Sequence, residues 1–123
     1  MKILIADDSL IIRNSLKRLL LSLNSLIEVY ESINVKQTLD IFHELNPALI
    51  ILDIMMPDGN GMDVLKVIKQ RNPDQKVLIF TNFPNALNRK KCQELGADYF
   101  LDKTSEFEKI PDIVKEIMNK KEH

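Results

Sequence analysis

The sequence predicts an α/β domain built on one doubly wound parallel sheet, with five strands and five helices. Short apolar runs alternate with longer stretches of helical period, and this alternation is typical of βαβ units. Three of the runs, at 2–6, 48–52 and 76–80, are almost wholly apolar. Strands buried on both faces of a sheet have this composition, so these runs are expected to form its centre.

Four stretches show a clear helical period, and most have recognisable ends. Ser9 is a good N-cap for the first helix. The second helix ends before Pro47, and the third starts near Gly61 and ends at Pro73. The residues expected on the apolar faces are, from the first of these helices to the last, Ile12, Leu16, Leu19, Leu20 and Leu23; Val35, Leu39 and Phe42; Val64, Leu65 and Ile68; and Phe107, Ile110, Val114, Ile117 and Met118.

The remaining elements are less apolar. The run 26–31 alternates polar and apolar residues, so we expect it at an edge of the sheet, and 99–102 is the fifth strand. A further helix is expected over 85–95, with a thin apolar face. At roughly 25 cal/mol per Å² of apolar burial this helix gains little from docking, so we expect it to shift early. A well-solvated helix is the alternative interpretation.

Length and composition favour a single domain over residues 1–123. The net charge of −1 gives no electrostatic basis for direct nucleic-acid or membrane binding. The one cysteine, Cys92, cannot form an internal disulfide, and no apolar stretch approaches the roughly 20 residues that span a bilayer. Met1 and Lys2 lead directly into a strand, which leaves no room for a signal peptide. We therefore expect a cytoplasmic domain.

Polar side chains stand just past four of the predicted strands. Asp7 and Asp8 follow 2–6, Asp53 follows 48–52, Thr81 follows 76–80, and Lys103 follows the fifth strand. In a parallel sheet these side chains emerge along one edge, where open α/β sheets bind ligands. Carboxylates, a hydroxyl and an amine gathered there predict a site for a divalent cation and a phosphoryl group.

The carboxylates also have simpler interpretations. Asp8 or Ser9 could serve only as a helix cap, although that accounts for one acidic residue and not for two. Asp53, at the mouth of a dry sheet before a loop rich in Pro and Gly, could be a metal ligand or a nucleophile that forms an aspartyl phosphate. Asp58 is a competing carboxylate, but its place beside Gly59 favours a turn former.

Thr81 and Lys103 are informative through their joint placement. Alone, Thr81 could hydrogen-bond the chain as it leaves the strand, and Lys103 could be one more solvated lysine. Together with a cation they would supply one partner for each of the three oxygens of a phosphoryl group on Asp53, which is how phosphoryl transfer is assisted.

Over essentially its full length the chain resembles the receiver domain of two-component response regulators, in particular the single-domain, chemotaxis-regulator-like kind. The resemblance rests on motifs that occur in order at strand ends. These are Asp7-Asp8, Asp53-Ile54-Met55-Met56-Pro57 with Gly61 beyond, Thr81, Gly96-Ala97-Asp98 and Lys103. The family's fold is flavodoxin-like, with strand order 2-1-3-4-5.

The resemblance implies a role for each site residue. Asp53 would be the phosphoacceptor, and Asp8, Asp53 and the backbone carbonyl of Met55 would hold Mg²⁺, with Asp7 acting through metal-bound water. Thr81 and Lys103 would bind the phosphoryl oxygens.

The resemblance also implies a switch and partners. Thr81 would move inward on phosphorylation and the aromatic residue Phe100 would follow, while Tyr99 packs near the last helix. The domain would be a signalling phosphoacceptor and not an enzyme acting on a separate substrate. A sensor histidine kinase or phosphotransfer protein would supply the phosphoryl group, and the 85–95 helix, the fifth strand and the last helix would contact an output partner. The basic cluster Arg89, Lys90 and Lys91 would meet an acidic partner or remain a solvated face.

Departures from the family pattern affect the surroundings of Asp53. Asn82 stands where the family usually has a small residue, and Thr104 follows the lysine where proline in a cis turn is common, so we expect a trans bond there. Met55 and Phe83, at positions thought to tune dephosphorylation, are bulky and apolar. They predict slow self-dephosphorylation.

Other functions fit the sequence less well. A Mg²⁺-dependent phosphohydrolase with an aspartyl-phosphate intermediate usually needs a second carboxylate two residues after the nucleophile, where this chain has Met55. A flavodoxin-like FMN binder would need a phosphate-cradling Ser/Thr/Gly loop, and the complete acidic set argues against an unphosphorylated pseudo-receiver.

Overall fold

The computed structural model describes residues 1–121, so residues 122 and 123 of the predicted 1–123 domain lie outside the described residues. Its main sheet is parallel, with the order β2-β1-β3-β6-β7. The strands are β2 (Glu28–Ser32), β1 (Lys2–Ala6), β3 (Leu49–Leu52), β6 (Lys76–Thr81) and β7 (Tyr99–Asp102). In chain order this is the predicted 2-1-3-4-5 arrangement, which is therefore confirmed, and the strand expected over 26–31 is at an edge as predicted, although it spans Glu28–Ser32.

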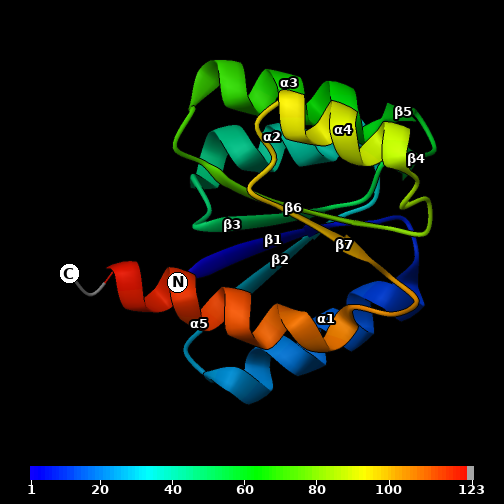
Figure 1. Cartoon of the computed structure of the whole chain (residues 1–123). Coiled ribbons are helices and arrows are strands. Elements are labelled where there is room, and N and C mark those ends of the chain that lie inside the picture. Colours follow the sequence, from blue (N-terminus) through cyan, green and yellow to red (C-terminus); the bar gives the residue numbers. More distant parts are fainter. Residues whose placement is uncertain (122–123) are drawn as a thin grey trace.

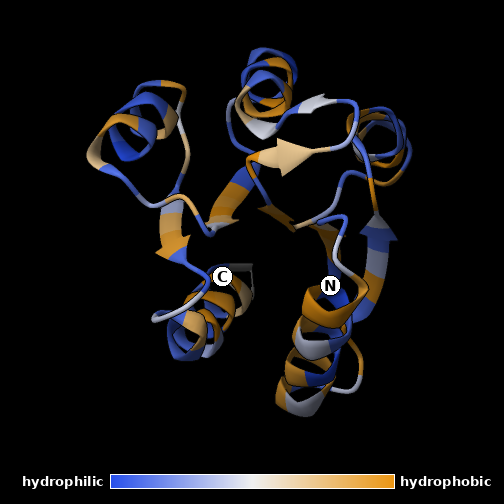
Figure 2. Ribbon diagram, turned by 90° about the vertical axis from the view of Figure 1, so that its right-hand side faces the viewer, coloured by the Kyte–Doolittle hydropathy of each residue, from blue (hydrophilic) through white to orange (hydrophobic). Residues whose placement is uncertain are grey.

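Helices cover both faces of the sheet (Figure 1). On one face lie α1 (Leu10–Leu23) and α5 (Ile110–Lys121), and on the other lie α2 (Val35–Leu45), α3 (Gly61–Arg71) and α4 (Ala86–Glu94). Figure 2 shows the same layers from the edge at which the strands end, with apolar ribbon gathered toward the sheet. No helix within 1–121 is both long enough and apolar enough to cross a bilayer.

Strand β1 shows why the central runs are apolar throughout. Ile3 and Ile5 belong to the core under α1 and α5, whereas Leu4 and Ala6 belong to the core under the other three helices. All four side chains are completely buried. Because successive residues of a strand face opposite sides, a strand with helices on both faces has no side chain that faces solvent. The predicted helix faces fill the same two cores.

Three boundaries differ from the sequence-based expectation. Strand β2 begins at Glu28, because a turn centred on Asn24 holds the amides of Leu26 and Ile27. Phe107 lies in a short 3₁₀ turn (Phe107–Lys109), and α5 itself begins at Ile110, with Pro111 in its first turn where a missing N–H costs nothing. The stretch after Asp53, expected to be a fixed, exposed loop, contains a small antiparallel hairpin of β4 (Met55–Met56) and β5 (Gly59–Asn60).

Helix α4 packs as thinly as its sequence predicts. Cys92 is its only fully buried residue, and Leu87 is 60% exposed. The capping residue Asn85 accepts a hydrogen bond from the Asn88 amide at 2.8 Å. A helix fixed by one buried side chain and a cap loses little contact when it moves.

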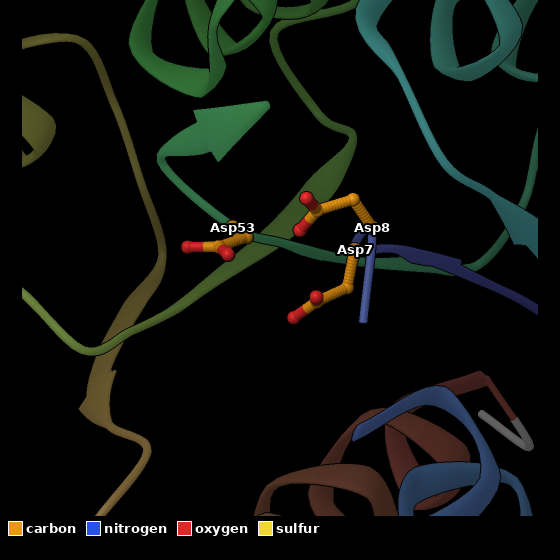
Figure 3. A group of neighbouring side chains, drawn as sticks. All are labelled: Asp7, Asp8 and Asp53. Atoms are coloured by element: carbon orange, nitrogen blue, oxygen red, sulfur yellow. The ribbon is translucent and has the colours of Figure 1, made fainter. Parts of the chain in front are cut away.

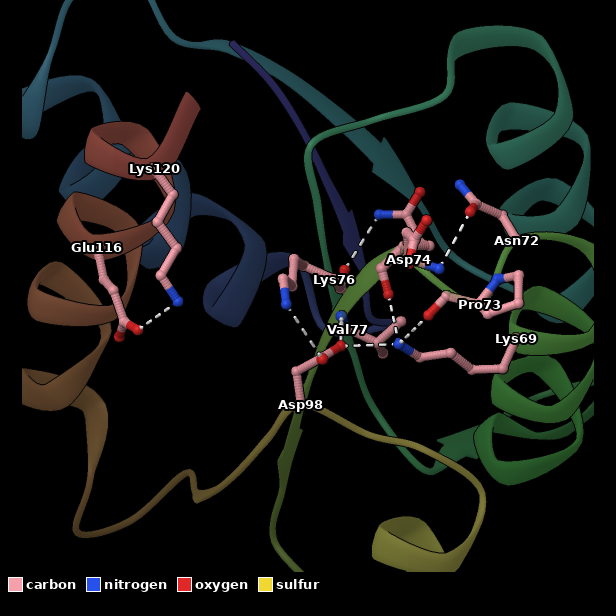
Figure 4. Close-up of polar contacts among 10 residues, drawn as sticks. Lys69, Asn72, Pro73, Asp74, Lys76, Val77, Asp98, Glu116 and Lys120 are labelled. Atoms are coloured by element: carbon pink, nitrogen blue, oxygen red, sulfur yellow. Dashed lines mark hydrogen bonds and ion pairs between the residues drawn. The ribbon is translucent and has the colours of Figure 1, made fainter. Parts of the chain in front are cut away.

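The amino edge of the sheet is joined by a partly exposed ion pair (Figure 4). Lys69 of α3 donates from Nζ to Oδ2 of Asp98 at 2.9 Å and to the carbonyl of Gln75 at 2.6 Å. The same Asp98 oxygen accepts from the amide of Val77 at 2.9 Å. These bonds fix the starts of β6 and β7, and thereby the register that carries Lys103 to the opposite edge.

Candidate functional site

The backbone places three site residues by the same device. The amide of Asp7 donates to Ser32 O at 3.0 Å, that of Asp53 to Ala6 O at 3.0 Å, and that of Lys103 to Thr81 O at 2.9 Å. Each residue is the first beyond its strand, and each bond extends the ladder to the neighbouring strand. The side chains are thus held by the sheet itself at its carboxyl edge.

Lys103 joins two of the acids. Its Nζ lies 2.6 Å from Oδ2 of Asp7 and 2.9 Å from Oδ2 of Asp53. All three side chains are less than 10% exposed, so Lys103 is not a solvated surface lysine. Asp8 adds a third carboxylate, and one oxygen from each acid lies within 4.8 Å of the others. Figure 3 shows the three carboxylates directed toward a common space from the ends of β1 and β3.

Asp7 has further partners that the sequence did not reveal. Its Oδ1 accepts from the amide of Ser9 at 2.9 Å, and its backbone carbonyl accepts from Arg13 Nη1 at 2.9 Å. Arg13 in turn pairs with Glu31 at 3.1 Å. The sequence feature that could have indicated these contacts is Arg13 itself, a cationic residue near the start of a helix that begins just after two aspartates. With Lys103 on Oδ2, both carboxylate oxygens of Asp7 are engaged.

The pKa values of Asp53 and Lys103 are both raised, for different reasons. Burial raises the pKa of Asp53, Lys103 opposes this, and the nearby charge of Asp7 adds to it, so the pKa is above the ordinary value near 3.8. For Lys103, burial alone would lower the pKa, but hydrogen bonds to Asp7 and Asp53 outweigh it and raise the pKa. The lysine therefore stays charged, while ionised Asp53 is held under electrostatic strain.

The acidic cluster has the donor set and spacing to hold a metal ion. Oδ1 of Asp53 is buried and has no hydrogen-bond partner within the described residues, and a buried oxygen left in this way is costly. Asp8 is exposed, and its carboxylate makes no hydrogen bond to any residue of 1–121. One ammonium facing three carboxylates leaves negative charge that a hard divalent cation would neutralise.

The acids open into a surface cavity of about 430 Å³. Met55, Asn82 and Phe83 line it together with the acids and Lys103. Met55 is 55% and Phe83 49% exposed, so both large apolar side chains stand at the mouth of the cavity. Within 1–121 every peptide bond is trans, including Lys103–Thr104 as predicted.

Within the described residues, neither Thr81 nor Phe100 lines the cavity that contains the acids. Thr81 is completely buried, and its hydroxyl accepts from the amide of Phe83 at 3.0 Å, the simpler of the two interpretations considered for it. Phe100 is half-buried, and the guanidinium carbon of Arg89 lies 4.5 Å from its ring centroid. Tyr99 packs on the opposite face, in the core shared with α5, as expected.

Asp58 does more than form a turn. Its Oδ1 accepts from the amide of Val35 at 2.7 Å and its Oδ2 from that of Lys36 at 3.2 Å. These bonds lower the pKa of Asp58 and attach the β4–β5 hairpin to the first turn of α2. The interpretation of Asp58 as only a turn former was incomplete, because a cap from a distant loop leaves no local pattern.

The fold and the site together define a flavodoxin-like α/β domain with an acidic, metal-competent pocket at its carboxyl edge. A family model for the response regulator receiver domain matches residues 3–115. Response regulator protein VraR of Staphylococcus aureus is 30% identical over 114 residues, which cover 93% of this chain and 54% of VraR. The chain thus spans about half the length of the curated relatives it matches.

Solved structures agree with this match. The signal receiver domain of a DNA-binding response regulator from Colwellia psychrerythraea has a TM-score of 0.91 at 22% identity, covering 97% of this chain and 98% of that one. A BeF3-activated DrrB receiver domain has a TM-score of 0.81 at 27% identity, covering 96% and 97%. The chain belongs to the family of response regulator receiver domains.

The substitution Asp53→Asn is expected to raise the melting temperature without divalent cations, since it removes a charge that burial disfavours. It should also abolish the stabilisation expected from Mg²⁺ in the wild type, which linkage puts at about 2.7 kcal/mol when Mg²⁺ is about 100 times its Kd. Thermal unfolding followed by circular dichroism, with and without Mg²⁺, measures both effects. Asp74→Asn, at an exposed position on the opposite edge, is the control. Equal Mg²⁺ stabilisation of Asp53→Asn and wild type would contradict the assignment.

Mg²⁺ affinity is expected to fall on acidification, beginning at a higher pH than an ordinary aspartate would cause, because Asp53 has a raised pKa. The Asp53 contribution to the stability of the metal-free protein should instead increase on acidification. The native state binds the Asp53 proton more tightly than the unfolded chain, so this contribution is complete below about 3.8 and is lost as pH rises through the raised native pKa. Calorimetric titration and thermal unfolding across this window test both signs. A pH-independent difference between wild type and Asp53→Asn would contradict them.

Proposed function

We propose that residues 1–123 form one receiver domain that accepts a phosphoryl group on Asp53 from a phosphohistidine of a sensor kinase or phosphotransfer protein. The observation that carries the proposal is the buried, unpartnered Oδ1 of Asp53, beside Lys103 and two further acids at an open cavity. A nucleophilic carboxylate needs to be accessible, anionic and flanked by cations. Asp53 lines an open cavity and contacts the Lys103 ammonium, which supports this role.

The donor atoms fit Mg²⁺ as the cofactor. Asp8 and Asp53 have free carboxylate oxygens, whereas both oxygens of Asp7 are engaged by Lys103 and Ser9. This division supports Asp8 and Asp53 as direct ligands, with Asp7 acting through bound water. The Met55 carbonyl is the further direct ligand that the resemblance to receiver domains implies. When bound, the cation supplies charge neutralisation for the incoming phosphoryl oxygens.

In the transfer, the P–N bond of the donor phosphohistidine breaks and a P–O bond to the Asp53 carboxylate forms, while the leaving imidazole keeps or gains one proton. Lys103 already contacts Asp53, and its ammonium is positioned to pair with a phosphoryl oxygen. Its contact with Asp7 keeps it in place when the charge on Asp53 changes. The lysine thus stabilises charge without moving a proton.

The signal would be a change of packing near Thr81, Phe100 and α4. The Thr81 hydroxyl now accepts a hydrogen bond from the Phe83 amide. A phosphoryl oxygen on Asp53 would be a charged acceptor to which the same hydroxyl could donate, and such hydrogen bonds are stronger than neutral ones. Movement of Thr81 would free space for Phe100, and α4, buried only at Cys92, is the element with least to lose by following. The proposed output is therefore a shift between two packings of this region, biased by the negative charge of the phosphoryl group.

The proposed output surface comprises α4, β7 and α5. Arg89, Lys90 and Lys91 are exposed on α4 and would favour an acidic protein partner. Direct nucleic-acid or membrane binding is not part of the proposal. We place the domain in the cytoplasm, since that is where the proposed phosphodonor domains act.

Multiple turnover of a phosphate ester would require a group that activates water against the aspartyl phosphate. The position two residues after Asp53 is Met55, an apolar side chain at the mouth of the cavity. The domain is therefore proposed to assist its own phosphorylation and slow dephosphorylation, and not to act as an enzyme on separate substrates.

Incubation with Mg²⁺ and a small acyl phosphate such as acetyl phosphate is expected to add one phosphoryl group, which mass spectrometry should map to Asp53. Asp53→Asn should prevent the adduct, and chelation of Mg²⁺ should slow it at least tenfold. Asp74→Asn is again the matched control and should be modified like the wild type. An adduct on Asp53→Asn, or none on the wild type, would refute the proposal.

Replacement of Met55 or Phe83 by glutamine is expected to speed loss of the phosphoryl group. A single hydrogen bond that orients the attacking water contributes about 1 kcal/mol, or roughly a fivefold increase in rate. Decay of the phosphorylated protein after donor removal, followed by mass spectrometry, gives the rates. Leu26→Gln, at an exposed apolar position outside the cavity, should decay like the wild type. Unchanged decay in both cavity variants would show that these side chains do not shield the phosphoryl group.

A further inference from the structure

The β4–β5 hairpin begins at the site and is closed at its base by Gly61. The amide of Gly61 donates to the carbonyl of Ile54 at 2.6 Å. A Cβ at Gly61 would overlap the carbonyl oxygen of Asp53, so only glycine lets the chain return this closely. Two-residue strands have little stability of their own. The position of Met55, in the first strand of the hairpin, therefore depends on what holds the rest of it.

The tip of the hairpin is held by α2. Asp58 accepts from the amides of Val35 and Lys36 at 2.7 and 3.2 Å. Gly59 lies so close to Val35 that an added Cβ would be 3.1 Å from its Cγ2. Figure 1 shows the hairpin beside the N-terminal end of α2 at the right of the molecule. These contacts join the hairpin to α2, a helix that begins more than 20 residues earlier in the chain.

Helix α2 is itself fixed to the strand end that orders Asp7. The hydroxyls of Thr38 and Ser32 lie 2.8 Å apart and are buried, and the Ser32 carbonyl accepts from the amide of Asp7. Asp58 therefore links the Met55 side of the cavity to the Asp7 side. The helix also has its own cap, because Asn34 accepts from the amide of Gln37 at 2.8 Å. Capping alone does not account for a second acceptor from another loop.

We propose that Asp58 is a positioning residue for the acid site, which tethers the β4–β5 hairpin to α2 and so fixes the Met55 backbone beside Asp53. The inference rests on the proposed function, in which the Met55 carbonyl is a cation ligand. Asp58 touches neither the cation nor the phosphoryl group, and it acts only through the hairpin. Its negative charge at the N-terminus of α2 adds a favourable helix-dipole contribution to the tether.

The experiment compares Asp58→Ala with Asn34→Ala. Both remove a side-chain acceptor from the N-terminus of α2, but only the first detaches the hairpin. Asp58→Ala is expected to weaken Mg²⁺ binding about tenfold by calorimetric titration, as losses of supporting groups around metal sites do. In the metal-free protein the Gly61 amide should exchange faster with solvent. Asn34→Ala should lower the melting temperature comparably while leaving Mg²⁺ affinity and Gly61 protection unchanged.

Asp58→Asn serves as the conservative rescue. Asparagine is as good an N-cap acceptor as aspartate, so most of the Mg²⁺ affinity and Gly61 protection should return. With acetyl phosphate as donor, Asp58→Ala should need more Mg²⁺ for half-maximal phosphorylation but reach nearly the wild-type rate at saturation. Equal effects of Asp58→Ala and Asn34→Ala on a wild-type protein that binds Mg²⁺ would overturn this inference alone. A wild type that neither binds Mg²⁺ nor is phosphorylated would overturn it together with the proposed function.

Discussion

The contact of the Lys103 ammonium with Asp7 and Asp53 is the interaction on which the site depends. It brings together residues from three strands, at 2.6 and 2.9 Å, in surroundings that exclude most water. A buried carboxylate without such a partner would take up a proton. The lysine partly offsets the effect of burial on the pKa of Asp53, yet one ammonium cannot neutralise three carboxylates. The negative charge that remains makes the site receptive to a divalent cation and strains Asp53.

The rest of the structure supplies the rigidity that this strained arrangement needs. The ladder bonds at Asp7, Asp53 and Lys103 extend a sheet whose central strands are buried on both faces, and Lys69 with Asp98 fixes the register of β7 at the opposite edge. Beside this fixed part lies α4, which buries one side chain fully. A charge added to the rigid side can therefore be relieved by motion of the soft side at little cost in packing.

The sequence was sufficient for the parts of the molecule that follow a period or a strand end. The central strands were predictable because burial on both faces requires continuous apolar residues, and Asp7, Asp8, Asp53 and Lys103 because parallel strands end at one edge. The hairpin was not predictable, since strands of two residues show no alternation. The bonds from Arg13 to Asp7 and from Asp58 to α2 join distant segments, and a single sequence shows no trace of which partner a polar side chain will find.

The β4–β5 hairpin, which no local sequence pattern revealed, forms one side of the proposed cation site. Lys103 organises the acids from the sheet side, but the proposed cation ligand, the Met55 carbonyl, lies in the hairpin, whose own pairing spans two residues on each strand. A hairpin that short has to be held at both ends to keep a carbonyl in place. Gly61 holds its base against Asp53, and Asp58 holds its tip against α2. The loop that looks least regular in the sequence is therefore as constrained as the strands it connects.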